Sequence, residues 1–233
     1  MRFSSIFTLV SSITVTSAVP LSLLAPTTPA PGLTGGDGVL QLANINNQLL
    51  RLNANISGLD IGTIQSQAGS LNLFNFVRST LGKILNPVVG GLSQTGSLHT
   101  TYDQAVAQLQ ALAAKNVNLS QAESAQAEAI IKSITEQYKL LFDNLQAKRP
   151  AFDAVSASGI SWLVNVLLGL VGGQVPTGTP VGTINSGLGT TLQDVQRLVP
   201  VLLQRADPAV RSSLQTALEA LGNLISARVT IYG

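Results

Sequence analysis

Hydrophobic and polar positions alternate along this chain with the period of an α-helix. Between residues 45 and 59, apolar side chains recur at steps of four and three, and asparagine and glutamine fill most positions between them. Apolar spacing predicts further helices at about 70–92, 97–114, 120–148, 158–171, 190–205 and 208–232. Alternation typical of a strand competes only in the last few residues. The predicted fold is therefore all-α, an antiparallel bundle of six or seven helices with a flexible N-terminal leader.

Local signals refine the ends of the helices. Ser120 followed by Glu123 forms a capping box, in which each residue satisfies a free amide of the first helical turn. Pro150 is predicted to stop that helix, with Lys148 and Arg149 favouring its negative C-terminal end. Asp207-Pro208 is typical of a new helix start.

Proline, glycine and threonine divide the chain outside these helices. Residues 19–38 are rich in all three and are predicted to form the flexible leader. A similar composition predicts a loop over 172–189. The remaining pattern is continuous, so residues 39–233 are expected to form a single helical-bundle domain.

The N-terminus has the pattern of a secretory signal peptide. Arg2 precedes an uncharged stretch of apolar and small hydroxylated residues, and small residues lead to a cleavage site after Ala18. We therefore assign residues 1–18 to a signal peptide and expect the protein to be secreted. Export makes the Asn-x-Ser triplets at Asn55 and Asn118 candidate N-glycosylation sites.

Composition limits the classes of partner. Only 10% of residues are charged and 4% are aromatic, so the exterior is expected to be weakly hydrated for an exported protein. Basic runs interleaved with aromatic residues are missing, which argues against nucleic-acid binding. The uncharged run within 158–171 is too short to be a transmembrane anchor. With no cysteine, the fold must depend on its core alone.

Catalytic side chains are scarce, and we expect no enzyme activity, no cofactor and no metal site. The single histidine, His99, stands near a helix start without an obvious partner and is interpreted as a solvated surface residue. The acidic residues are spread singly and are interpreted as helix caps or solvated positions. The glycine-rich stretches lack the lysine-serine ending of a phosphate-binding loop.

One central stretch, LQAKRPAFDAVSASGISWLVNVLLGL, resembles the fungal hydrophobic surface-binding protein A family, also called cell wall galactomannoproteins. The family tends to show a leucine-rich helix ending in basic residues, a short segment with phenylalanine, and a valine/leucine helix. The matching residues here are Leu145, Lys148, Arg149, Phe152, Val164 and Leu167. TTYDQAVAQLQAL and TTLQDVQRLVPVLLQRADPAVRSSLQTALEALGNLISA resemble two other family segments. The loop at 172–189 is longer than the family pattern.

The resemblance implies a secreted or cell-wall-associated helical protein that adsorbs to hydrophobic surfaces and recruits secreted lipolytic enzymes. It also implies that some relatives hold fatty acids inside the bundle. Hydrophobic surfaces or lipids, a secreted hydrolase and cell wall polysaccharide are therefore the expected partners.

Three functions stay open on the sequence. The first is adsorption, for which the apolar surface candidates are Phe74, Phe76, Trp162, Leu163, Val166 and Leu167. The second is a fatty-acid or lipid carrier with a cavity in the bundle core, for which the lining candidates are Ile134, Leu141, Val166 and Leu202. The third is a structural cell wall glycoprotein, in which glycans on Asn55 and Asn118 matter most.

Overall fold

The computed structural model describes residues 34–60, 62, 91–92, 96–157 and 180–229. Most of this part is helical, and it contains no strand. Its helices are α1 (Gly35–Ser57), α5 (Ser97–Ala114), α6 (Gln121–Ala157), α8 (Pro180–Arg205) and α9 (Arg211–Arg228). The all-α prediction is confirmed. The structure describes five helices rather than six or seven, and the expected helices at 70–92 and 158–171 fall almost entirely outside the described residues.

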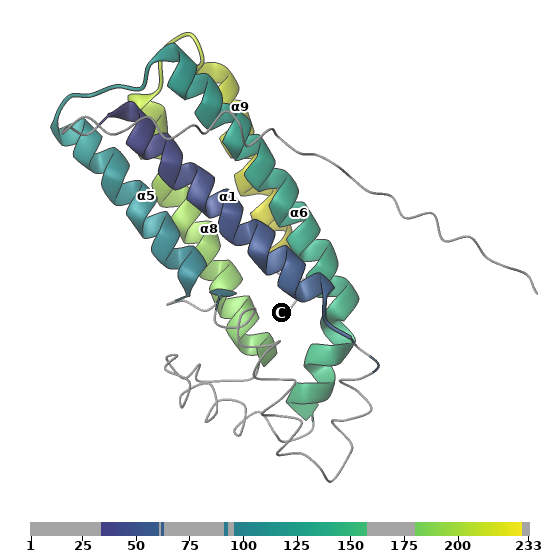
Figure 1. Ribbon diagram of the computed structural model, residues 1–233. Helices are drawn as coiled ribbons and strands as arrows, with labels where there is room; N and C mark the ends of the chain where they lie inside the picture. The colour runs from purple at the N-terminus through teal and green to yellow at the C-terminus, as the bar shows by residue number, and fades with distance from the viewer. Residues whose placement is uncertain (1–33, 61, 63–90, 93–95, 158–179, 230–233) are drawn as a thin grey trace, which may run out of the picture. The chain divides into compact units, whose positions relative to one another are not determined.

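These five helices form a closed ring around one core. In the ring, α1 packs on α5, α5 on α8, α8 on α9, α9 on α6, and α6 on α1. Figure 1 shows α1 lying between α5 and α6. A short turn at 115–120 joins α5 to α6, so these two helices are neighbours along the chain and flank α1 in space.

Helix directions only partly fit the predicted antiparallel bundle. Successive described helices alternate in direction along the chain, and α1·α5 and α8·α9 are antiparallel neighbours (Figure 1). Three other neighbouring pairs, α1·α6, α5·α8 and α6·α9, are parallel, because residue numbers rise together on both helices of each pair. The contacts that show this are Asn46–Ser133 and Asn53–Gln137, His99–Asp194 and Asp103–Arg197, and Glu128–Ser213 and Asp143–Arg228. Neighbours in the ring are therefore not all antiparallel, because α1 lies between α5 and α6.

The core contains the apolar stripes that the sequence predicts. On α1 the fully buried side chains include Ile45, Leu49 and Ile56, and on α9 they include Leu214, Leu218 and Leu221. Gly38 lets α1 approach α5 closely, because a Cβ there would lie 2.9 Å from Leu109 Cδ2. Burial of this continuous aliphatic core is the main source of stability in a chain without cysteine.

The turn after α5 is a complete Schellman motif. Asn116 has a φ of 55°, in the left-handed region that asparagine tolerates better than most residues. The Val117 amide donates to the Leu112 carbonyl at 2.9 Å, and the Asn116 amide donates to the Ala113 carbonyl at 3.0 Å. α6 then begins with the predicted capping box, in which the Ser120 amide donates to Glu123 at 2.8 Å.

α1 begins earlier than the sequence predicts. The amide of Thr34 donates to the Asp37 carboxylate at 2.7 Å, which caps the first turn. Residues 35–38, predicted to end the flexible leader, therefore belong to α1. The glycines there were interpreted as loop residues, but Gly35 and Gly38 pack inside the bundle.

The prediction that Pro150 stops α6 is wrong. The helix continues to Ala157, with Pro150 exposed and Phe152 fully buried. Burial of the Phe152 side chain offsets the loss of the hydrogen bond that Pro150 cannot donate. Lys148 donates to the Leu59 carbonyl just after α1 rather than to the end of its own helix, and Arg149 pairs with Asp153 at 3.5 Å.

The segment predicted as a loop at 172–189 is helical from Pro180 onward, because α8 begins there. Ile184, Leu188 and Val195 are buried at helical spacing, and this burial outweighs the weak helix propensity of the glycines. At the other end, α9 begins at Arg211 rather than directly after Asp207. Asp207 still accepts from the Ala209 amide at 2.8 Å and so orders the turn.

Among the helices that the structure describes, none combines the length and apolar character that a membrane span needs.

Phe152→Ala is expected to lower the free energy of unfolding by about 3–4 kcal/mol, because it leaves a cavity where a fully buried ring packs. Asp153→Ala is the matched control: it removes a carboxylate whose pair with Arg149 is exposed, and costs less than about 1 kcal/mol. Urea unfolding followed by circular dichroism measures both. Equal losses in the two variants would contradict the extension of α6 past Pro150.

Candidate functional site

The interior of the ring is the first candidate site. Three of the predicted lipid-cavity residues, Ile134 and Leu141 on α6 and Leu202 on α8, are fully buried. The two helices pack against each other across the bundle. The fourth, Val166, lies outside the described residues. The described residues therefore line one aliphatic interior, an environment suited to an acyl chain and poorly suited to a polar ligand.

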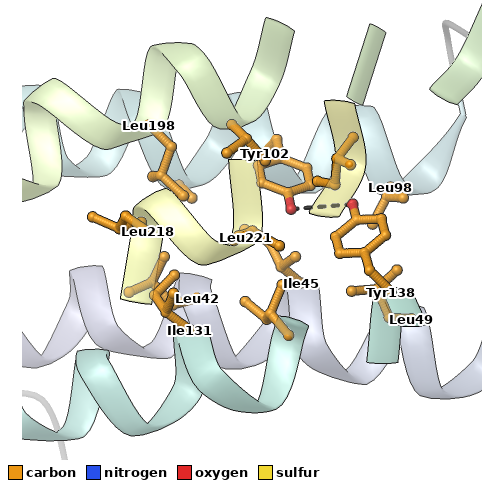
Figure 2. Close-up of a cluster of buried hydrophobic side chains, with 14 of the residues drawn as sticks. Leu42, Ile45, Leu49, Leu98, Tyr102, Ile131, Tyr138, Leu198, Leu218 and Leu221 are labelled. Atoms are coloured by element: carbon orange, nitrogen blue, oxygen red, sulfur yellow. Dashed lines mark hydrogen bonds between the residues drawn. The ribbon is translucent and has the colours of Figure 1, made fainter. Parts of the chain in front are cut away.

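A pair of tyrosine hydroxyls interrupts this apolar interior. Tyr102 of α5 and Tyr138 of α6 extend toward each other across the core, with their hydroxyl oxygens 3.1 Å apart (Figure 2). Both side chains are fully buried. Either hydroxyl of this pair can donate to the other. The buried hydroxyl of Thr191 on α8 donates to the Gly187 carbonyl of its own helix at 3.0 Å.

Burial raises the pKa of both tyrosines. For Tyr102, desolvation is the largest cause, and the nearby charge of Asp194 adds to it. For Tyr138, desolvation again dominates and the Tyr102 hydroxyl adds to it. Both hydroxyls therefore stay neutral over the physiological range.

The His99 cluster (His99, Asp103, Asp194 and Arg197) is a second site, and it lies between α5 and α8. His99 Nδ1 lies 2.7 Å from Asp194 Oδ2, and His99 Nε2 lies 3.3 Å from Asp103 Oδ2. Arg197 donates to Asp103 Oδ1 at 2.8 Å and also to Asp194 Oδ1. Hydrogen bonding to Asp194 is the main cause that raises the pKa of Arg197.

The interpretation of His99 as an unpartnered, solvated residue is therefore wrong, and Asp103 and Asp194 are not isolated. One ligand atom from each of His99, Asp103 and Asp194 lies within 4.8 Å of the others, a spacing that a metal ion can use. However, the two carboxylates approach different ring nitrogens, and both also bond to Arg197. The arrangement is that of a closed ion-pair ring rather than of ligands converging on one point.

The predicted surface residues are not placed by the structure. Phe74, Phe76, Trp162, Leu163, Val166 and Leu167 all lie outside the described residues. Among the described residues, three other large aliphatic side chains are exposed: Leu40 (48%) and Leu50 (45%) on α1, and Leu140 (50%) on α6. Both candidate glycosylation residues are exposed as well, Asn55 in the last turn of α1 and Asn118 in the turn before α6.

Sequence reasoning missed both polar clusters. Tyr102 and Tyr138 stand at apolar-stripe positions of their helices, but nothing local in the sequence shows that their hydroxyls meet. For the His99 cluster one signal was available, since His99 and Asp103 stand one helical turn apart. Asp194 and Arg197 come from α8, and Asp194 stands 95 residues after His99 in the sequence.

The site and fold together define a helical bundle with an aliphatic interior. The sequence matches no protein-family model, and no curated protein matches it. The fold is similar to that in the crystal structure of AfMP4p, an Aspergillus fumigatus cell wall galactomannoprotein, in complex with palmitic acid. The similarity has a TM-score of 0.53 at 14% identity and covers 85% of this chain and 99% of AfMP4p. At this identity the likeness is one of fold.

Tyr138→Phe and Tyr102→Phe are each expected to lower the free energy of unfolding by about 1–3 kcal/mol, because each leaves the buried hydroxyl of the other tyrosine without this hydrogen bond. The double variant should cost less than the sum of the two single variants, because it leaves neither hydroxyl buried alone. Urea unfolding of the four proteins closes this cycle. Simple additivity would contradict a shared hydrogen bond.

Proposed function

We propose that this chain is a secreted, non-enzymatic protein that binds a fatty acid or another long acyl chain inside its helical bundle. The observation that carries the proposal is the fold, which is shared over 85% of the chain with a bundle solved in complex with palmitic acid. The aliphatic interior supports it independently, because that interior presents apolar side chains from all five described helices.

The chemistry of the interior favours an acyl chain over other ligands. Burying each methylene contributes roughly 0.8 kcal/mol, so a long chain gains much from displacing or separating aliphatic side chains. Ile134 and Leu141 on α6 and Leu202 on α8 are fully buried in the core and are the interior contacts that we assign to the ligand. The neutral hydroxyls of Tyr102 and Tyr138 are polar groups buried within this core.

Export and wall association complete the proposal. They rest on the signal-peptide pattern of residues 1–18 and on the resemblance to cell wall galactomannoproteins. The exposure of Asn55 and Asn118 favours glycosylation at both, and such glycans would contact cell wall polysaccharide. In this account the glycans retain the protein in the wall, and the bundle binds lipid.

Adsorption to hydrophobic surfaces is the second candidate function. The exposed side chains of Leu40, Leu50 and Leu140 favour it, because they lie on α1 and α6, two helices that pack together. With 10% charged residues, the chain has few ions to keep such a surface hydrated. In this role the adsorbed protein would recruit a secreted lipolytic enzyme, as the family resemblance implies.

Leu141→Phe is expected to weaken palmitic acid binding by about tenfold or more, because a larger side chain overfills the interior. Leu140→Phe is the matched control, since the adjacent side chain is half exposed and should leave binding unchanged. Delipidated mature protein is titrated with palmitic acid and its occupancy is read by native mass spectrometry. Cooperative thermal unfolding and an unchanged circular dichroism spectrum confirm that the variants fold. Equal binding by both variants, or no stoichiometric palmitate on the wild type, would contradict the proposal.

The triple variant Leu40→Gln, Leu50→Gln, Leu140→Gln is expected to retain palmitate binding and to adsorb at least about threefold less to polystyrene beads, because it removes exposed apolar area. Depletion of the protein from solution by the beads measures adsorption. The matched control replaces three exposed polar residues, Gln104→Asn, Gln110→Asn and Gln126→Asn. Unchanged adsorption of the leucine variant would show that these three exposed leucines are not the source of the affinity for hydrophobic surfaces.

A further inference from the structure

Arg205, in the last turn of α8, has a buried hydrogen-bond donor without an acceptor. The donor is its Nε atom, and within the described ranges no atom accepts a hydrogen bond from it. Buried donors in folded proteins are almost always bonded, and one that is not destabilises the fold. The last turn of a helix favours a positive charge, but that position gives Nε no acceptor. Arg205 therefore has hydrogen-bonding capacity that the described fold does not use.

The acidic side chains of the protein do not supply this acceptor. All 11 of them stand in the described part of the chain, and the ion pairs there leave Arg205 without a carboxylate partner. By contrast, Arg149, Arg197 and Arg228 each pair with an aspartate. Asp207, two residues after Arg205, accepts from a backbone amide of the next turn at 2.8 Å. A carboxylate for Arg205 must therefore come from something other than a side chain of this protein.

Arg205 stands at one end of the aliphatic interior. Leu202, one helical turn earlier on α8, is fully buried and is one of the contacts that we assign to an acyl chain. The Arg205 carbonyl accepts from the Leu119 amide at 2.9 Å, which places the end of α8 against the turn between α5 and α6. Leu119 and Ala206 are themselves buried. The apolar core thus leads to a half-buried guanidinium.

Further along the core, near the tyrosine pair, an anionic group would meet a like charge. Asp194 lies about three helical turns before Arg205, or about 16 Å along α8, and its side chain is buried. Burial raises the pKa of Tyr102 and Tyr138, and the charge of Asp194 adds to this effect. A carboxylate beside the tyrosines would lose its hydration close to a like charge, whereas one at Arg205 would meet an opposite charge.

We propose that Arg205 binds the carboxylate of the acyl ligand, so that the protein prefers a fatty acid to a neutral ester of the same chain. This inference rests on the proposed function and adds the residue that selects the head group. A guanidinium presents Nε and a terminal nitrogen as parallel donors, which match the two oxygens of a carboxylate. The acyl chain then follows the buried side chains of α8 from Leu202 to Leu188, which extend over about 21 Å.

Arg205→Met tests the assignment, because methionine keeps an unbranched stem and removes the donors and the charge. Delipidated mature protein is titrated at neutral pH with palmitic acid and, separately, with methyl palmitate, and occupancy is read by native mass spectrometry. The variant is expected to bind palmitic acid at least about tenfold more weakly than wild type, and methyl palmitate within about twofold. Arg51→Met is the matched control, since Arg51 is exposed on α1 and its loss should change neither affinity.

Two further measurements separate a ligand contact from a structural role. Without ligand, Arg205→Met should unfold at or above the wild-type temperature, because it removes an unsatisfied buried donor. With palmitic acid labelled with ¹³C at the carboxyl carbon, the bound head group should titrate at least about one pH unit lower in wild type than in the variant, because the guanidinium favours the ionised form. Arg205→Lys serves if Arg205→Met does not fold: it keeps the charge without the paired donors and should weaken palmitic acid binding at least about threefold.

The outcomes distinguish this inference from the proposed function. If wild type binds neither ligand, the proposed function is wrong and the inference fails with it. If wild type binds both ligands and Arg205→Met binds palmitic acid as tightly as wild type does, the interior holds lipid but Arg205 is not its head-group contact. Equal weakening for the acid and the ester, or a large loss of thermal stability without ligand, would make Arg205 a structural residue and overturn the inference.

Discussion

Burial of one aliphatic interior by five helices is the constraint on which the rest of the structure depends. The chain has no cysteine and few charges, so apolar burial must hold the ring together. That requirement explains why helices form beyond their local signals, as α6 does past Pro150 and α8 does from Pro180. It also produces the aliphatic interior into which the proposed function places an acyl chain.

A purely apolar interior does not fix the register of one helix against the next. Polar contacts between parallel neighbouring helices do. Asn53 bonds to Gln137 and Asn144, which fixes the register of α1 on α6. The His99 cluster does the same for α5 on α8, and the Glu128–Ser213 bond, at 2.6 Å, for α6 on α9. Lys132 and Ser213 also lower the pKa of Glu128, so this contact persists in its ionised form through neutral pH. Each contact is satisfied within the bundle, which keeps the cost of these polar groups low.

Much of the fold was predictable because helical periodicity reports burial directly. The stripe from Ile45 to Leu59 and the capping box at Ser120 stand where the sequence indicates. The ends of α6 and α8 were not predictable, since they depend on burial of Phe152 and Ile184 against helices distant in the sequence. Candidate lipid contacts were found by their periodicity, whereas the tyrosine pair and the His99 cluster depend on packing across helices that no local pattern encodes.

The central claim is that an acyl chain enters the interior rather than coating the exterior. Isotope-edited NMR with ¹³C-labelled palmitic acid and methyl-labelled protein tests this most directly. The account predicts cross-relaxation from the acyl methylenes to the interior methyl groups of Ile134, Leu141 and Leu202. Contacts confined to the exposed Leu40, Leu50 and Leu140 would instead show that the lipid coats the surface of a closed bundle.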